Sequence, residues 1–258
     1  MVVIAALFIA FAVIAAVAVE RNTTVQLITR RDAAAAQLTR LANAIIEYGA
    51  FNATGTTLLY PCPARTDLLN NNADFGKAVQ LATGTEIVAA PTAYANCSSI
   101  VGDVGGTPVT TVNGYLTVLG VGNGVVRGMV PVQNLSQYGT GANDAFDPWN
   151  NRIMYVVNRN LTRAGSGANA ANPTVTDART NYAIPAPDFI LISYGRDGVG
   201  GIRRGSTTVS ITCTSPSSVL RFDNCEVGDA IFKQSPTYTA SSAGATTYFD
   251  DVITYYRQ

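Results

Sequence analysis

Histidine is absent from the 258 residues of this chain, and its absence limits the chemistry that the chain can perform. Histidine is the commonest general base and the commonest metal ligand near neutral pH. Ser-His-Asp and Cys-His catalytic sites are therefore excluded, as are haem and zinc sites with histidine ligands. Serine–lysine and paired-carboxylate chemistry stay open, but we expect a protein that is not an enzyme and that requires no cofactor.

The four cysteines are the next reactive group, and they are widely spaced: Cys62, Cys97, Cys213 and Cys225. No Cys-x-x-Cys pair occurs, so a zinc ribbon or a thioredoxin motif is not indicated. Two disulfides in an oxidising compartment are the preferred interpretation. Of the three connectivities, Cys62–Cys97 with Cys213–Cys225 is favoured because it closes the shorter loops. Four buried free thiols are the alternative.

The single tryptophan follows a turn signal, Asp147-Pro148. Aspartate and proline start turns, so we expect Trp149 to anchor a hydrophobic core beside the next strand, rather than to stack on a ligand. Lysine plus arginine equal aspartate plus glutamate at 17 each, so no net charge attracts nucleic acid, and no nucleic-acid partner is expected.

These groups must be positioned by elements that begin with an apolar N-terminal run. Met1 to Val19 contains no charged or polar residue, and Glu20-Arg21 ends the run. As a helix it would be about 28 Å long, close to the thickness of a bilayer's hydrocarbon core. A cleaved secretory signal is disfavoured because no basic residue precedes the run. A membrane anchor and an assembly helix that first sits in the membrane fit equally well.

An apolar stripe continues beyond Glu20, and it predicts that the helix continues too. The stripe consists of Val25, Ile28, Ala35, Leu38, Leu41, Ile45 and Tyr48. No Gly or Pro interrupts the chain before Gly49. We therefore predict an apolar membrane and assembly helix over 1–24 and its amphipathic continuation over 25–50. An anchor followed by an independent core helix is the alternative.

From residue 51 to 258 we expect one globular, β-rich extracytoplasmic domain. Strands are predicted at Tyr115–Val121, Arg152–Val157, Phe189–Ser193 and Asp251–Tyr256, and long loops over 67–114, 163–180 and 202–247. The predicted fold class is α+β, with the long helix packed on an antiparallel sheet and with long loops tied by disulfides.

Three motifs occur in a fixed order behind the apolar helix: Tyr60-Pro61-Cys62-Pro63-Ala64, Asp147-Pro148-Trp149-Asn150-Asn151, and Ser193-Tyr194-Gly195-Arg196-Asp197-Gly198-Val199-Gly200-Gly201. The set resembles the type II secretion pseudopilins and related type IV pilin-like proteins. In that family an Asp-x-Trp-Gly-Asn turn leads into a strand, and a later strand ends in Ser-x-Gly-x-Asp-Gly-x-x-Gly-Gly. The resemblance implies a pilin-like fold and assembly through the N-terminal helix, here represented by Met1, Ala5, Ile9, Ile14 and Glu20.

One departure from the family concerns the axial register of neighbouring helices. Family members carry a glutamate at the fifth mature position, which pairs with a neighbour's N-terminal amine. Here that position is Ala5 if Met1 is the first mature residue, and no acid precedes Glu20. Either register by that ion pair is dispensed with, or Met1 is not the processed terminus.

The Ser193–Gly201 segment resembles the calcium-binding loop of major pseudopilins. Calcium requires six to eight oxygen ligands, and the resemblance implies Asp197, Asp223 and Asp229 as carboxylate donors. In this chain Ile202-Arg203-Arg204 intervenes before the later acids. The alternative is a glycine-rich turn in which Asp197 caps the backbone.

The function implied is a structural subunit of an extracellular or periplasmic type IV pilus-like filament. Its partners would be copies of itself, the inner-membrane assembly machinery and, before assembly, membrane lipid. A minor or tip pseudopilin of a secretion or DNA-uptake machine is one alternative. A membrane-anchored binding protein that does not polymerise is the other.

Overall fold

A computed structural model describes residues 2–81, 87–89, 117–119, 124–162, 172–177, 180, 182–184, 186–211, 224, 230–235 and 251–258. Some residues have a described backbone only; these are 2–15, 17–21, 80–81, 87–89 and 117–119. The fold is α+β, with one long N-terminal helix and an antiparallel sheet, as predicted.

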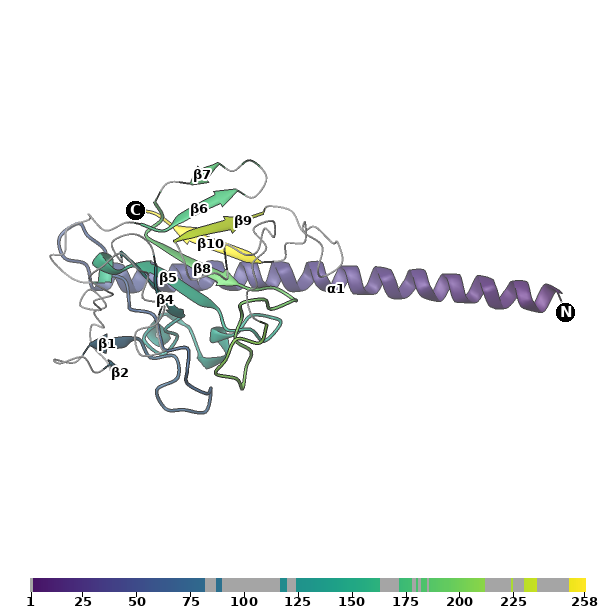
Figure 1. The fold of residues 1–258 in the computed structure, drawn as a ribbon, viewed down its shortest axis with the longest axis horizontal. Helices are drawn as coiled ribbons and strands as arrows, with labels where there is room; N and C mark the ends of the chain where they lie inside the picture. The colour runs from purple at the N-terminus through teal and green to yellow at the C-terminus, as the bar shows by residue number, and fades with distance from the viewer. Residues whose placement is uncertain are drawn as a thin grey trace.

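Helix α1 spans Val2–Phe51 without a break, so the predicted continuation past Glu20 is confirmed. At 1.5 Å per residue its 50 residues give a rod of about 75 Å. The C-terminal part of α1 lies along the domain, whereas its N-terminal half projects beyond it (Figure 1). Phe51 ends the helix, and the chain then turns through Gly55, whose φ of 65° suits glycine.

The main sheet has five antiparallel strands in the order β10-β8-β5-β4-β3. Their bounds are Val252–Tyr256 for β10, Phe189–Ser193 for β8, Met154–Asn158 for β5, Val125–Met129 for β4 and Thr117–Leu119 for β3. In the register, Phe189 of β8 lies opposite Tyr256 on one side and Val157 on the other. The last strand of the chain therefore completes the sheet beside α1, which it contacts together with β8.

Both faces of this sheet are covered, and alternate side chains along the strands pack into different core clusters. Tyr155, Val157, Phe189 and Leu191 belong to the cluster that includes Leu38, Leu41 and Ile45 of α1. Val156, Ile190 and Ile192 instead belong to a second cluster with Val175 and Phe232. A strand that is buried on both faces reads as a continuous apolar run, as Phe-Ile-Leu-Ile does in β8.

The second cluster is covered by a smaller sheet in the order β7-β6-β9. Its strands are β6, Thr174–Asp177, β7, Ala183–Ile184, and β9, Ile231–Gln234; β6 and β9 pair in parallel. A hairpin of β1, Val79–Leu81, and β2, Ile87–Ala89, forms a separate pair. Parts of the three segments predicted as loops are therefore strands, which the prediction missed because each is only three or four residues long.

Three short 3-10 helices complete the described elements: η2, Ser136–Tyr138, η3, Ala142–Ala145, and η4, Arg159–Thr162. The four predicted strands are present, with β8 at the bounds predicted for it. Strand β4 was missed because its run, Val-Val-Arg-Gly-Met, contains a charge and a glycine.

Two further predictions need correction. Over the residues that the structure describes, no helix combines the length and the apolar character needed to cross a membrane. For that part of the chain the predicted transmembrane helix is wrong. The described residues also contain no complete disulfide. Cys62 is buried and disulfide-bonded, but Cys97, Cys213 and Cys225 lie outside the described residues, so the partner of Cys62 is not described. The prediction of two loops tied by Cys62–Cys97 and Cys213–Cys225 is therefore not supported as it was made.

Candidate functional site

The Asp147 turn is built around one buried carboxylate. Asp147 Oδ1 accepts hydrogen bonds from the backbone N–H groups of Trp149, at 2.9 Å, and Asn151, at 2.8 Å. Asn150 has a φ of 65°, which an asparagine tolerates in a turn. Trp149 is partly buried against the main core cluster, so the structural interpretation of this motif is confirmed.

The same carboxylate joins this turn to the Ser193–Gly201 loop. Ser193 Oγ donates to Asp147 Oδ2 at 2.7 Å, and Asn151 Nδ2 donates to the carbonyl of Gly195 at 2.7 Å. Asp147 is only 4% exposed, and this burial raises its pKa to about 6, although its hydrogen bonds act in the opposite direction. Two of the three motifs that carry the family resemblance, the Asp147 turn and the Ser193–Gly201 loop, are thus one hydrogen-bonded unit.

Asp197 lies in this loop, and its carboxylate is used locally. Its Oδ1 accepts from the backbone N–H of Val199 at 3.1 Å, which is the capping role given as the alternative to calcium. Asp223 and Asp229, the other proposed ligands, lie outside the described residues. Among the residues that the structure does describe, no group of three acids, cysteines or histidines could hold a metal ion.

Two buried arginines are structural features that the sequence reasoning missed. Arg127 of β4 donates to the carbonyl of Asn224 at 2.9 Å and contacts the hydroxyl of Tyr194. Asn224 in turn donates to Asp251 Oδ2 at 2.8 Å. Burial lowers the pKa of Arg127 to about 10, against the attraction of the Asp251 carboxylate. The signal available in the sequence was an arginine inside an apolar run.

Arg152, at the start of the β5 segment, holds two loops together. Its guanidinium donates to the carbonyls of Thr66 and Leu68 at 2.8 and 2.7 Å and also contacts that of Ser206. Burial lowers the pKa of Arg152 to about 10. The group is fully enclosed and bound to backbone oxygens, so we assign it a structural role.

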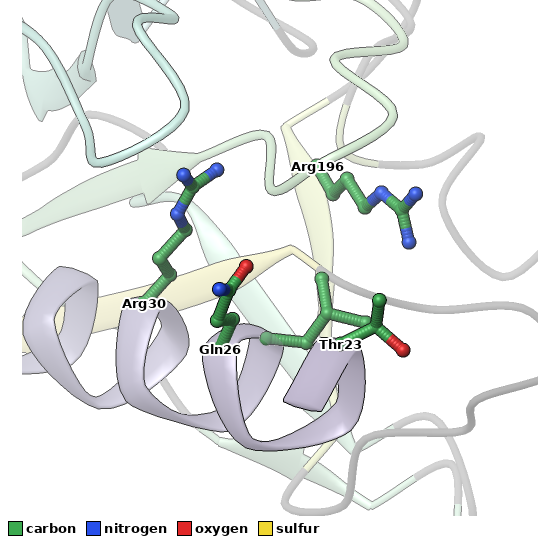
Figure 2. Close-up of a pocket in the computed structure, with 5 residues that line it drawn as sticks. Thr23, Gln26, Arg30 and Arg196 are labelled. Carbon is green, nitrogen blue, oxygen red and sulfur yellow. The ribbon is translucent and has the colours of Figure 1, made fainter. Parts of the chain in front are cut away.

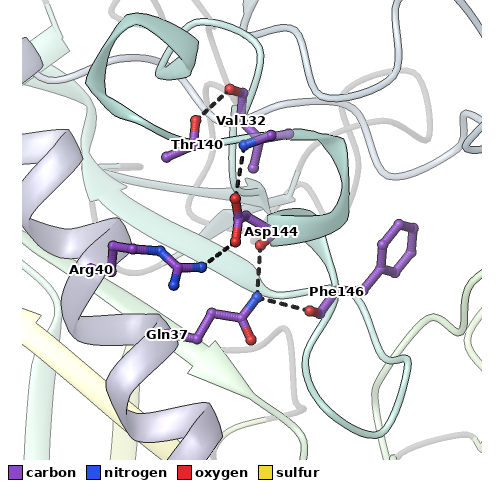
Figure 3. A network of polar contacts seen from close by, with 7 residues as sticks. Gln37, Arg40, Val132, Thr140, Asp144 and Phe146 are labelled. Carbon is purple, nitrogen blue, oxygen red and sulfur yellow. Dashed lines mark hydrogen bonds and ion pairs between the residues drawn. The ribbon is translucent and has the colours of Figure 1, made fainter.

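Polar contacts fix the orientation of α1 on the domain. Gln37 Nε2 donates to the carbonyls of Asp144 and Phe146 at 3.2 and 2.9 Å, and Arg40 forms an ion pair with the Asp144 carboxylate (Figure 3). Asp144 Oδ2 also accepts from the N–H of Gly141 at 2.8 Å, so it caps η3 as well. Nearer the N-terminus, Arg31 donates to the carbonyl of Ser235, just after β9, at 3.0 Å.

The predicted apolar stripe of α1 is only partly covered by the domain. Leu38, Leu41 and Ile45 are fully buried, whereas Val25 is 60% exposed and Ile28 is 50% exposed. At about 100° per residue, Val25 lies roughly 160° around the helix from Leu41. The apolar stripe therefore does not face the core along its whole length, because Val25 and Ile28 face away from the domain.

The side of α1 that continues the domain-facing surface forms a polar pocket instead. Thr23, Gln26, Leu27 and Arg30 share one face of the helix and, with Arg196, line a pocket of about 130 Å³. Figure 2 shows Gln26 and Arg30 extending from the helix toward the loop that carries Arg196. Of the predicted assembly positions, Met1 lies outside the described residues, as do the side chains of Ala5, Ile9, Ile14 and Glu20.

Comparisons with known protein families, with curated proteins and with solved structures give no match. The resemblance to pilin-like proteins therefore rests on the sequence motifs alone.

Proposed function

We propose that this chain is a structural subunit of a pilus-like filament and that it assembles with copies of itself through α1. The observation that carries the proposal is the exposure of Val25 and Ile28 on the face of α1 turned away from its own domain. In a polymer, a neighbouring copy of the subunit would cover these exposed side chains. The predicted transmembrane helix and disulfide ties form no part of the proposal.

The extent of uncovered helix supports this function. Before Ala34, none of the residues of α1 whose side chains are described (Ala16 and 22–33) is buried, and the backbone of the helix projects from the domain as a rod (Figure 1). By its sequence, the first part of that rod, Val2 to Val19, carries no polar side chain. A single helix that is apolar all round is stable in water only when other surfaces cover it.

The driving force would be the burial of apolar side chains between copies. Fully burying one Val, Leu, Ile or Phe side chain contributes about 1.5–3 kcal/mol relative to leaving it exposed. Several such side chains per copy would offset the loss of translational and rotational freedom, which costs about 4–15 kcal/mol on association. A filament suits this geometry because the helix of every copy can cover the apolar side chains of one neighbour and be covered by another.

A truncation tests the proposal. Removing residues 1–24 deletes no described side chain that is buried in the domain, so the remaining chain is expected to fold. The intact chain is expected to form fibres by electron microscopy, and the truncated chain is expected to stay monomeric by light scattering. An intact chain that stays monomeric in the same buffer would refute the function.

A point variant gives a sharper form of the same test. Ile9→Asp places a carboxylate in the apolar segment, where burial without a partner costs several kcal/mol, so fibres should be abolished. Asn22→Asp is the matched control because Asn22 is exposed and already polar. Fibres that persist in the Ile9→Asp variant would refute assembly through α1.

A further inference from the structure

The surface loop that follows β8 is exposed but firmly anchored. Residues 203–211 are exposed at every position except Ser206, which is half-buried. The Ser206 carbonyl accepts from the fully enclosed guanidinium of Arg152, and the Ser210 N–H donates to the Gly201 carbonyl at 2.9 Å. A surface that is preorganised in this way loses little conformational freedom when a partner covers it, so the loop is suited to binding.

This loop presents two neighbouring apolar side chains to solvent. Val209 is 46% exposed and Ile211 is 45% exposed. They lie two positions apart on a segment that pairs with Ile202 and Val199, and alternate side chains of an extended segment point to the same side. We call Val209 and Ile211 the loop surface. A single exposed apolar residue is ordinary, but a pair on an anchored loop offers a partner a continuous apolar contact.

The most exposed large apolar side chain in the described part of the chain is Phe51, at 78%, and it lies at the other end of the domain. Gln258, just after β10, donates to the Thr56 carbonyl at 2.8 Å, so the end of β10 lies near the end of α1. Because β8 is antiparallel to β10, it starts there and leads toward Arg196, which lines a pocket with Arg30. Figure 1 shows β8 pointing from the C-terminal end of α1 toward its projecting half.

This arrangement suits a contact between successive copies. On the proposed function, on which this inference rests, copies that assemble in parallel through α1 turn the Phe51 end of one copy toward the loop surface of another copy displaced along the axis. We infer that Val209 and Ile211 of one copy receive Phe51 of a second copy in a head-to-tail contact. Each copy carries both halves of this contact, one at each end, so the contact repeats without closing.

The inference implies an approximate axial offset between the two copies. Arg30, which lies beside the loop, and Phe51 are 21 positions apart on one continuous helix, which corresponds to about 32 Å along its axis. Copies in head-to-tail contact are therefore offset by roughly this length. An antiparallel pair would instead join the two surfaces twice and close as a dimer.

Cysteine cross-linking in fibres of the full chain tests the topology of this contact. Ala50→Cys places a thiol beside Phe51, and Val209→Cys places one on the loop surface; both positions are exposed. A chain with both cysteines, treated with a short bifunctional thiol reagent, should give a ladder of linked chains. A mixture of the two single variants should give dimers only, and each single variant alone should match the unsubstituted chain.

A charge on either surface should weaken assembly. Phe51→Glu and, separately, Ile211→Glu each place a carboxylate in the apolar contact, and each should raise the monomer concentration needed for fibres by roughly tenfold or more. Both positions are exposed, so the domain is expected to fold. Tyr182→Glu is the matched control, because Tyr182 is also an exposed large side chain but belongs to neither surface, and it should leave that concentration unchanged.

The outcomes distinguish this inference from the function on which it rests. If the wild-type chain forms no fibres, the proposed function and the inference both fail. If fibres form but the chain with both cysteines gives no ladder, the inference alone is overturned. Dimers as the largest product of that chain would show an antiparallel pair, and links above background in either single variant would show a symmetric contact; each result overturns the inference. Fibres that assemble equally well with Phe51→Glu overturn it too.

Discussion

Replacing Asp147 by asparagine tests the electrostatics of the motif unit directly. Asp147 is enclosed at the junction of two turns, and it accepts hydrogen bonds from Trp149, Asn151 and Ser193. Burial raises its pKa from 3.8 to about 6. Asparagine has nearly the same shape and still offers Oδ1 to the two backbone N–H groups, but it cannot ionise.

The size of the expected change in the free energy of unfolding follows from the pKa of Asp147. Between pH 4 and 6 the folded state holds a proton that the unfolded state has lost, so the free energy of unfolding falls as the pH rises. At 1.36 kcal/mol for each tenfold change, the shift from 3.8 to about 6 corresponds to a loss of about 3 kcal/mol. This contribution is fully present below pH 4 and is gone above about pH 7.

Burial also raises the pKa of Asp188, whose carboxylate accepts from the Tyr60 hydroxyl at 3.1 Å. Asp188 therefore also makes the free energy of unfolding fall as the pH rises. The Asp147→Asn variant should lose only part of the total pH dependence. Ser193→Ala removes a hydrogen bond that lowers the pKa of Asp147, so it should move the pH midpoint of the effect upward.

The assay is urea denaturation of the chain lacking residues 1–24 at pH 4, 5, 6 and 7, followed by tryptophan fluorescence from Trp149. The wild type should lose stability across this range, and Asp147→Asn should lose about 3 kcal/mol less. Equal slopes for the wild type and Asp147→Asn would refute the reasoning. A midpoint that moves downward in Ser193→Ala would do the same.

Two matched pairs of variants test the packing of the domain. Leu38→Ala should lower the free energy of unfolding by about 2–5 kcal/mol because Leu38 is fully buried, whereas Val25→Ala should change it by less than about 0.5 kcal/mol in the monomer. Gly198→Ala should cost more than Gly139→Ala, by about 1–2 kcal/mol, in the same denaturation assay. Both glycines have positive φ, but a Cβ at Gly198 would lie 2.9 Å from Asn151 Oδ1, and one at Gly139 would meet nothing within 4 Å. Equal effects within either pair would contradict the packing described.

Elements with strong local signals could be predicted from the sequence. Strand β8 was found at its bounds because four apolar residues stand between turn residues, and α1 was found because nothing before Gly49 breaks a helix. The Asp147 turn was found because aspartate and proline encode it locally.

The partners of the buried charges depend instead on contacts between distant segments. Arg127 meets Asn224 across 97 residues, and Arg152 meets Thr66 across 86. No local pattern encodes either contact. The same limit applies to the parallel pairing of β6 with β9, because each strand is four residues long and becomes stable only against the main sheet.

The arrangement of layers leaves the N-terminal half of α1 without a sheet face in the described part of the domain. One face of the main sheet is occupied by the C-terminal part of α1, and the other is occupied by β6 and β9. The described part of the domain thus has no free sheet face on which the rest of the helix could fold back. Helix α1 is also unbroken, so it cannot bend at a glycine or proline to reach one. Val25 and Ile28 are exposed on the described part of the structure, and under the proposed function a second copy would cover them at every position along a filament.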